Sequence, residues 1–467
     1  MTKKWLAFLA LIPTASLIFL DQTILPVALP TIQQELEASS TALQWSVNAY
    51  FLTIAIFVLI SGKIGDRISH RKALFYGMMG FSFFSVLCAL SLNIEMLIIS
   101  RGLQGIGAAL MLPAQTAIIS QIFPQEQRGR VIGTIVGISS LFLILGPLIG
   151  GFLTETLSWR WIFWINLPIA LFGLWMIRTF LPSSDPQVKK IDSLGFLFFA
   201  CGVGALTTLF MQAAIWGWTS IESLLCIAII PISFGFLLWR EKQIPHPFLD
   251  LTLFKKPIYA AINISITTTN FIMMISVFRT IYLQEILDYT PLQTGLITCI
   301  SAAPVCFMAP VAGKLSDRFG PKLPVALGFL CLIFSFFFLG FFSTPSFTGL
   351  IIAFLSFGMG IPMIFTPSFA SAVSAVPPSK TGIAMGMIFT LRMLANTIGL
   401  ALIHLFVTTM QQSLTPSKGA RLAEIISFSR VHFVLGFLTI IVFAITFVLH
   451  NRKSSHEPPS SLGAGWD

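Results

Sequence analysis

The sequence predicts an all-α polytopic membrane protein of two six-helix bundles with two further helices inserted between them. The chain has a mean hydropathy of +0.88, and only 10% of its 467 residues are charged, against roughly a quarter in a soluble domain. The stretch GKIGDRISHRK at 62–72 recurs as GKLSDRFGPK at 313–322 between long apolar runs, which indicates duplicated halves. Lys and Arg fall mainly in alternate loops, as in chains that cross a membrane repeatedly.

About 20 mostly apolar residues span a bilayer as a helix, and the chain contains about 14 such runs. We expect spans at 5–28, 43–61, 73–93, 96–118, 131–153, 161–181, 193–212, 222–239, 258–283, 292–312, 324–342, 347–370, 382–408 and 431–450. The first run follows Lys3 and Lys4, as the core of a signal peptide would. Because it continues past Asp21 to Pro30 without a small-residue cleavage site, we interpret it as a retained helix.

The two hairpins start at Gly62 and Gly313, 251 residues apart, whereas six helices with short loops take roughly 180 to 200 residues. Two hydrophobic runs between Ser193 and about Trp239 account for the excess. We therefore predict an N-terminal six-helix bundle at 1–181, two inserted helices with linkers at 182–257, a C-terminal six-helix bundle at 258–450 and a disordered cytoplasmic tail at 451–467.

The distribution of Lys and Arg predicts the orientation, because basic residues stay preferentially in the cytoplasm. On this span assignment, about 21 of them lie at the chain ends and in one set of loops, and 4 lie in the other set. Both termini are therefore expected to be cytoplasmic. Only Arg101, Arg279 and Arg392 lie within spans, and Arg279 is close enough to a helix end to snorkel to the outer surface.

Composition and motifs exclude several classes of protein. The net charge of +10 does not predict nucleic-acid binding, because the basic residues separate apolar runs instead of sharing one face. The six cysteines lack CxxC spacing, so neither a metal site nor a disulfide framework is expected. No GxxxxGK[ST] signature or catalytic constellation is present, so we expect neither ATP drive nor an enzyme. The expected partners are membrane lipid and a small-molecule substrate; we expect a monomer, and whether a periplasmic adaptor takes part stays open.

The repeated hairpin predicts a conformational role. Gly62 and Gly65 allow a tight turn between helices, and Asp66 can meet a helix N-terminus. A purely topogenic loop is the alternative, but the recurrence of Gly-Lys and Asp-Arg favours gating. The expected gating residues in the two hairpins are Gly62, Gly65, Asp66, Arg67, Arg71, Gly313, Asp317 and Arg318. Gly146, Pro147, Gly150 and Gly151 predict a fifth helix that bends and packs closely, although close packing alone is an alternative.

Asp21 is the only carboxylate well inside a predicted span. An ionisable group in hydrocarbon is costly unless it faces a cavity or a partner, so Asp21 is the leading candidate for a proton site. Burial favours the protonated carboxyl and a nearby arginine favours the carboxylate, so alternating contact with Arg101 could load and release a proton. A fixed ion pair that packs two helices is the alternative. At about 1.5 Å per residue, Asp21 lies roughly 24 Å from the inner end of its helix and Arg101 roughly 8 Å from the outer end of its own, so their depths agree.

Several other polar residues within spans are expected to line a substrate cavity. These are Gln22, Asn48, Gln104, Gln115, Asn270, Arg392 and Asn396.

Four further stretches, LDQTILPVALP at 20–30, RGLQGIGAA at 101–109, GPLIGG at 146–151 and WRWIFWINLP at 159–168, follow one another on the expected spans. With them and the hairpins, the chain resembles the major facilitator superfamily and, within it, the fourteen-span drug:proton antiporters. The resemblance implies the major facilitator fold, a bacterial cytoplasmic membrane, and protons as coupling ion without a cofactor. It also implies that the first and fourth helices are neighbours, with Gln104 on the face of Arg101.

Three residues depart from the family pattern. Pro26 stands where the family usually has Asn, and Ser69 and Phe142 stand where it usually has Gly. The expected function is a proton-coupled exporter of small lipophilic or amphiphilic compounds. The alternatives are a dedicated exporter of an anionic or zwitterionic metabolite, such as a siderophore-like acid, which three intramembrane arginines would favour, an importer on the same fold, and a membrane sensor or scaffold that transports nothing.

Overall fold

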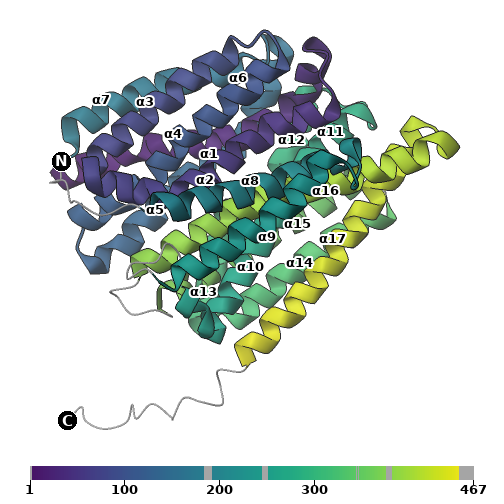
Figure 1. Ribbon diagram of the computed structural model, residues 1–467. Coiled ribbons are helices and arrows are strands. Elements are labelled where there is room, and N and C mark those ends of the chain that lie inside the picture. Colours follow the sequence, from purple (N-terminus) through teal and green to yellow (C-terminus); the bar gives the residue numbers. More distant parts are fainter. Residues whose placement is uncertain are drawn as a thin grey trace.

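The computed structural model describes residues 3–182, 192–243, 251–342, 344, 346–374 and 381–451, which form helices and no strands (Figure 1). The helices are α1 (Lys3–Glu35), α2 (Ser40–Ile68), α3 (His70–Ala89), α4 (Ile94–Ile122), α5 (Gln125–Thr156), α6 (Trp161–Trp164), α7 (Asn166–Phe180), α8 (Ser193–Trp216), α9 (Ile221–Glu241), η1 (Leu251–Lys255), α10 (Pro257–Met273), α11 (Ile275–Glu285), α12 (Pro291–Ala302), α13 (Pro304–Phe319), α14 (Lys322–Phe341), α15 (Phe347–Ser374), α16 (Thr381–Lys418) and α17 (Ala420–Asn451).

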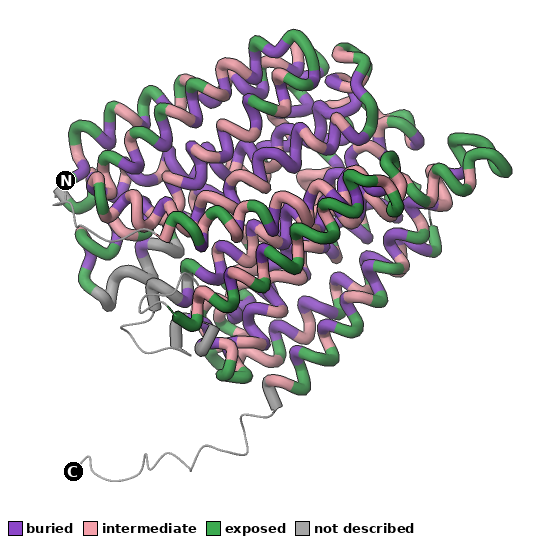
Figure 2. The backbone as a smooth tube through the Cα atoms, viewed as in Figure 1, coloured by how far each residue is buried: buried purple, intermediate pink, exposed green. Residues whose placement is uncertain are grey.

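Within the described residues, 14 helical segments are long and apolar enough to cross a membrane, which confirms the predicted number of spans. Helices α1 to α7 pack with one another, as do α10 to α17. The additional helix α8 contacts both α2 and α16, and α9 packs against α8 (Figure 1). Many side chains of α9 are exposed apolar residues, such as Leu224 and Ile232, and these suit contact with lipid (Figure 2). The tail predicted at 451–467 lies outside the described residues except for Asn451.

Side-chain caps fix where several spans begin. Ser39 accepts a hydrogen bond from the N–H of Ala42 at 3.2 Å, and Asn93 accepts one from Met96 at 2.9 Å. Asp192 caps α8 through the N–H of Gly195 and pairs with Arg240 of α9 at 2.8 Å. Burial alone would raise the pKa of Asp192, but the hydrogen bonds from Arg240 and Gly195 hold that pKa below its ordinary value. This ion pair therefore joins the inner ends of the two inserted helices.

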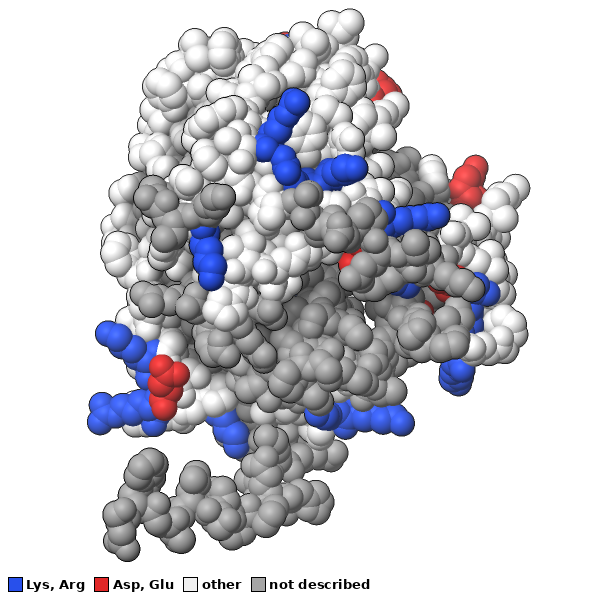
Figure 3. Space-filling model, turned by 90° about the vertical axis from the view of Figure 1, so that its left-hand side faces the viewer, with Lys and Arg blue, Asp and Glu red and all other residues white. Residues whose placement is uncertain are grey.

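Basic side chains gather on the face at which α1 begins and α17 ends (Figure 3). That face shows many Lys and Arg side chains and few Asp and Glu. The positive-inside rule assigns such a face to the cytoplasm.

The turn of each repeated hairpin lies elsewhere than predicted. Gly62 and Gly65 are inside α2, and the chain turns at Ser69, which has φ 85°. In the second copy, Gly313 is inside α13 and the turn is at Gly320, with φ 78°. Ser69 and Gly320 are equivalent positions, each seven residues after the first glycine of its copy. The expectation was wrong because the helical hydrogen-bond ladder runs through the glycines and stops only at the left-handed residue.

Ser69 is therefore expected to strain the first hairpin, since a left-handed conformation costs a residue with a Cβ roughly 1–2 kcal/mol. We expect Ser69→Gly to raise the free energy of unfolding by about 1 kcal/mol, and Gly320→Ser to lower it by a similar amount. Thermal unfolding of the purified variants measures both changes. Equal stabilities of wild type and both variants would show that neither turn is strained by a side chain.

Several spans differ in length or continuity from the hydropathy prediction. The interval between the spans predicted at 382–408 and 431–450 is almost entirely helical, with a single turn residue at Gly419. Hydropathy detects only the part of a helix within the bilayer core, so it missed these outer extensions. The span predicted at 292–312 is broken, because Pro304 begins α13 and lacks the N–H that would continue α12.

Candidate functional site

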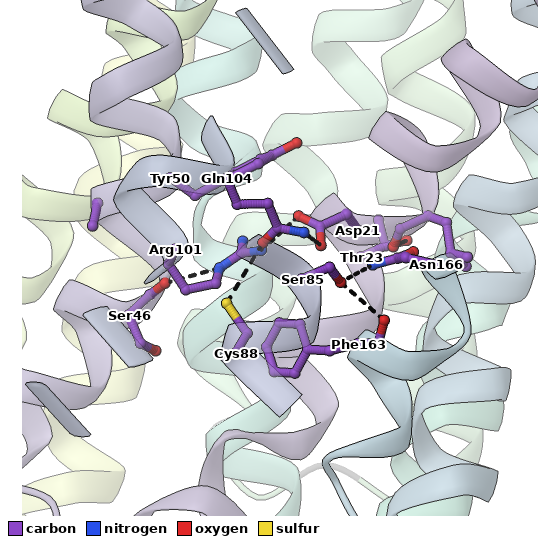
Figure 4. Close-up of polar contacts among 12 residues, drawn as sticks. Asp21, Thr23, Ser46, Tyr50, Ser85, Cys88, Arg101, Gln104, Phe163 and Asn166 are labelled. Atoms are coloured by element: carbon purple, nitrogen blue, oxygen red, sulfur yellow. Dashed lines mark hydrogen bonds and ion pairs between the residues drawn. The ribbon is translucent and has the colours of Figure 1, made fainter. Parts of the chain in front are cut away.

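Asp21 and Arg101 meet in the interior of the N-terminal bundle (Figure 4). Arg101 Nη1 donates to Asp21 Oδ2 at 2.7 Å and to Gln104 Oε1 at 2.6 Å. The amide Nε2 of Gln104 in turn donates to Asp21 Oδ1 at 3.2 Å. Residues 101 and 104 lie on one face of α4 because they are three positions apart, and that face is directed at α1. The three side chains form a closed triangle, and the two helices come together as the depths of Asp21 and Arg101 predict.

The triangle is shielded from solvent. The Asp21 and Arg101 side chains are each 1% exposed. The Nε of Arg101 donates to the backbone carbonyl of Ser46 at 3.2 Å, and its guanidinium carbon lies 4.3 Å from the centre of the Tyr50 ring. These contacts offset the desolvation of the pair, because a buried ion pair is stable only when its remaining donors and acceptors are also satisfied. Ser46 and Tyr50 were not predicted, since a backbone carbonyl and a ring face leave no signal in a sequence.

A second set of polar side chains lies beside the triangle (Figure 4). Asn166 Nδ2 donates to Ser85 Oγ at 3.1 Å, and Ser85 Oγ donates to the carbonyl of Phe163 at 2.9 Å. The thiol of Cys88 lies 3.9 Å from Gln104 Oε1. These bonds hold α3 against α6 and α7, which keeps the packing around Arg101 rigid.

The two bundles are hydrogen-bonded through the outer halves of their helices. Thr280 of α11 donates to the carbonyl of Pro26 at 3.2 Å, and Gln284 donates to that of Val27 at 2.8 Å. Thr41 of α2 lies 3.1 Å from His404 Nε2 of α16. We call these contacts, together with the bond between Asn48 and Thr397 and that from Cys299 to the carbonyl of Ile144, the outer seal.

The glycines of α5 make close contacts both within and between the bundles. Gly146 faces Thr23 and Gly150 faces Ile24 of α1, where a Cβ at Gly150 would lie 2.6 Å from the Ile24 carbonyl oxygen. Gly151 faces α12, and a Cβ there would lie 2.9 Å from Leu292 Cα. Only glycine permits this approach of backbones. Gly151 therefore belongs to the outer seal, while Gly146 and Gly150 join α5 to α1.

The structure places the residues expected in the substrate cavity in different surroundings. Asn48 is bonded within the outer seal, and Gln115 donates to the Leu11 carbonyl at 2.9 Å, a bond that fixes α4 to α1. Asn270 Oδ1 lies 3.4 Å from Arg392 Nε, which brings these two together in the C-terminal bundle. Gln22 is half-buried, and Asn396 is buried with no hydrogen-bond partner for its Oδ1 among the described residues.

The hairpin residues expected to gate lie at the inner ends of their helices. Asp66 contacts His70 at 3.2 Å, and Arg71 Nη2 donates to the last-turn carbonyl of Arg178 in α7 at 2.5 Å, so the first hairpin is attached to α7. Arg67, Asp317 and Arg318 are exposed.

Arg279 does not snorkel, in contrast to the expectation for a residue near a helix end. Its residue is 2% exposed, and its Nε donates to His432 Nε2 at 3.1 Å. The side chain points into the C-terminal bundle because aromatic rings of α14 and α15, among them Phe357 at 4.4 Å, surround the guanidinium. The pairing with His432 could not be predicted, since 153 residues separate the two.

Comparisons with known proteins agree on one family. The model of the Major Facilitator Superfamily matches residues 11–400. The chain is 32% identical to multidrug resistance protein Stp of Mycobacterium tuberculosis, over 83% of this chain and 73% of that protein. It is 31% identical to lincomycin resistance protein LmrB of Listeria monocytogenes over 82% of both chains, and 30% identical to riboflavin transporter RibZ of Clostridioides difficile over 89% of this chain and 90% of that one.

Solved structures show the same fold. The crystal structure of a bacterial homologue of the human lysosomal transporter Spinster, in an inward-facing and unoccupied conformation, has a TM-score of 0.71. Its sequence identity is 16%, and the match covers 98% of this chain and 100% of that one.

Proposed function

The chain belongs to the Major Facilitator Superfamily, whose members are membrane transporters and not enzymes, and on this premise we propose that it is a proton-coupled exporter of small lipophilic or amphiphilic compounds. In this proposal it lies in a bacterial cytoplasmic membrane with both termini in the cytoplasm, uses protons without a cofactor, and works by alternating access. The observation that carries the proposal is the buried triangle of Asp21, Arg101 and Gln104.

The triangle supports proton coupling because Asp21 has two alternative partners, a proton and Arg101. When Arg101 donates to it, the carboxylate form is stabilised, whereas separation of α1 from α4 would leave the carboxyl in a low dielectric, where the neutral form is favoured. A movement that changes the distance between these helices thus loads or releases one proton.

The outer seal supports an inward-facing arrangement. Its hydrogen bonds join α1 to α11 and α2 to α16 near the outer membrane surface. An exporter in this arrangement takes its substrate from the cytoplasm, and it must break the seal to release the substrate outside. The hairpin residues at the inner ends and the α5 glycines of the outer seal are then the two gates.

The relatives named for resistance to multiple drugs and to lincomycin support export of organic compounds. Arg392 favours a second candidate, a dedicated exporter of anionic or zwitterionic metabolites. Its guanidinium lies 5.3 Å from the centre of the Phe365 ring, beside Asn270, with no acidic partner among the described residues. A relative named as a riboflavin transporter is compatible with such a substrate and with import.

Uptake into inside-out vesicles tests the proposal. We expect an imposed proton gradient to drive accumulation of at least one compound from a panel of lipophilic cations, dyes, neutral antibiotics and organic acids. Accumulation of acids alone would favour the second candidate. Transport of a compound in the opposite direction with the same gradient would contradict export.

Gly151→Leu is expected to open the outer seal, because its side chain would collide with the backbone of α12. We expect Cys299, as the single cysteine in an otherwise cysteine-free chain, to react several-fold faster with a membrane-impermeant maleimide added from outside. Gly137→Leu is the matched control, since Gly137 lies on the same helix and a Cβ there meets nothing within 4 Å. Equal labelling of both variants would contradict closure of the outer side by these glycines.

A further inference from the structure

A buried arginine in the C-terminal bundle lacks acceptors for most of its N–H groups. Arg279 of α11 is 2% exposed, and its Nε donates to His432 Nε2 of α17 at 3.1 Å. The terminal nitrogens Nη1 and Nη2 have no hydrogen-bond partner among the described residues. The guanidinium carbon instead lies 4.4 Å from the ring centre of Phe357 and about equally far from two other phenyl rings, Phe336 at 5.5 Å and Phe354 at 5.4 Å.

The pair carries one uncompensated positive charge. His432 Nδ1 lies 2.7 Å from the backbone carbonyl of Phe428, which can only accept, so Nδ1 holds the hydrogen. Nε2 is therefore the acceptor for Arg279, and the imidazole is neutral. The arginine remains charged, since guanidinium groups are not deprotonated in proteins.

Acidic side chains on these two helices lie too far away to compensate that charge. Glu285 follows Arg279 by six residues and Glu424 precedes His432 by eight, which separates them by roughly 9 and 12 Å along the helices. The stacked rings of Tyr282 and Phe428, with centroids 3.7 Å apart, lie at the intervening positions of α11 and α17. The described residues contain no ion pair to Arg279.

The contrast with the N-terminal bundle shows what is missing. There, Arg101 has Asp21 and Gln104 as acceptors for Nη1. An unpaired charge and unsatisfied donors in a membrane interior cost several kcal/mol, and the faces of three phenyl rings offset only part of this. A guanidinium with two adjacent terminal nitrogens is well suited to a small anion or a carboxylate group.

We propose that Arg279, held in place by His432, binds a small monovalent anion through Nη1 and Nη2. The anion is either an inorganic halide or the carboxylate of an organic acid, because both present the same charge and acceptor chemistry. The site is separate from the Asp21–Arg101 pair and adjoins the outer seal, since Thr280 donates to the carbonyl of Pro26. Occupancy should therefore stabilise α11 where it contacts α1.

Thermal unfolding of the purified full-length protein tests this site without any transport assay. The protein is held in sodium gluconate at constant ionic strength and titrated with chloride, bromide or formate. We expect a saturable rise of the unfolding temperature by roughly 2 °C or more in wild type. Arg279→Met should abolish the rise, whereas Arg392→Met, which removes another arginine of the same bundle, should retain it.

Two further measurements cover a variant that fails to fold. Arg279→Lys should weaken the apparent anion affinity at least about tenfold, because one ammonium replaces two adjacent donors. In crystals grown with bromide, an anomalous peak is expected beside Nη1 and Nη2. A response to halides identifies an inorganic anion, and a response to formate alone identifies a carboxylate. No anion-specific rise in wild type, an undiminished rise in Arg279→Met, or no bromide peak despite a bromide response would overturn the proposal.

Discussion

Replacement of Asp21 by asparagine is expected to reduce proton-driven uptake to the level of vesicles that lack the protein. Asparagine has nearly the same shape, and its Oδ1 can still accept a hydrogen bond from Arg101, so the fold should persist. It cannot exchange a proton, so the movement of α1 relative to α4 would no longer depend on the proton gradient. The measurement is gradient-driven accumulation in inside-out vesicles at matched membrane expression.

Substrate exchange without a gradient separates loss of coupling from loss of binding. In Asp21→Asn we expect exchange of labelled for unlabelled substrate to continue while accumulation is lost. Asp288→Asn is the matched control, because Asp288 also pairs with an arginine, Arg421 at 3.3 Å, but its side chain is 77% exposed. Such an exposed pair contributes little, so accumulation should be unchanged. Unchanged accumulation in Asp21→Asn would place coupling elsewhere.

Replacement of Arg101 by methionine is expected to have the largest effect on stability. It leaves Asp21 and the Gln104 oxygen without their donor in a site that is 1% exposed, and breaking a buried ion pair by removal of one partner costs roughly 3–5 kcal/mol. We expect a marked fall in the unfolding temperature of the purified protein and in the amount that reaches the membrane.

The double variant Asp21→Asn with Arg101→Met tests whether the cost comes from the unpaired carboxylate. It should be more stable than Arg101→Met alone, since it contains no buried charge without a partner. If the two variants are equally unstable, the packing of Arg101 against Tyr50 determines the stability and the ion pair contributes little.

The sequence was sufficient to predict the spans and the proximity of Asp21 to Arg101. Hydropathy reports directly on membrane burial, and the rise of a helix converts sequence position into depth. Gln104 followed from its spacing to Arg101 on α4. These predictions rest on properties of single helices, which is why one chain without relatives sufficed for them.

Contacts between distant helices could not be predicted in the same way. His432 and Arg279 are 153 residues apart, and Asn48 and Thr397 are 349 apart, so only the packed structure reveals these partners. The turn at Ser69 was missed because glycine composition suggests where a helix can stop, whereas the continuing hydrogen-bond ladder decides where it does.

The movement of protons against substrate tests the central proposal most directly. Purified protein in liposomes that contain a pH-sensitive dye is given a substrate gradient and no initial proton gradient. We predict that substrate movement in one direction drives protons in the other in wild type, and that Asp21→Asn moves substrate with no change in dye signal. Substrate movement without proton movement in wild type, or an unchanged proton signal in Asp21→Asn, would contradict coupling at Asp21.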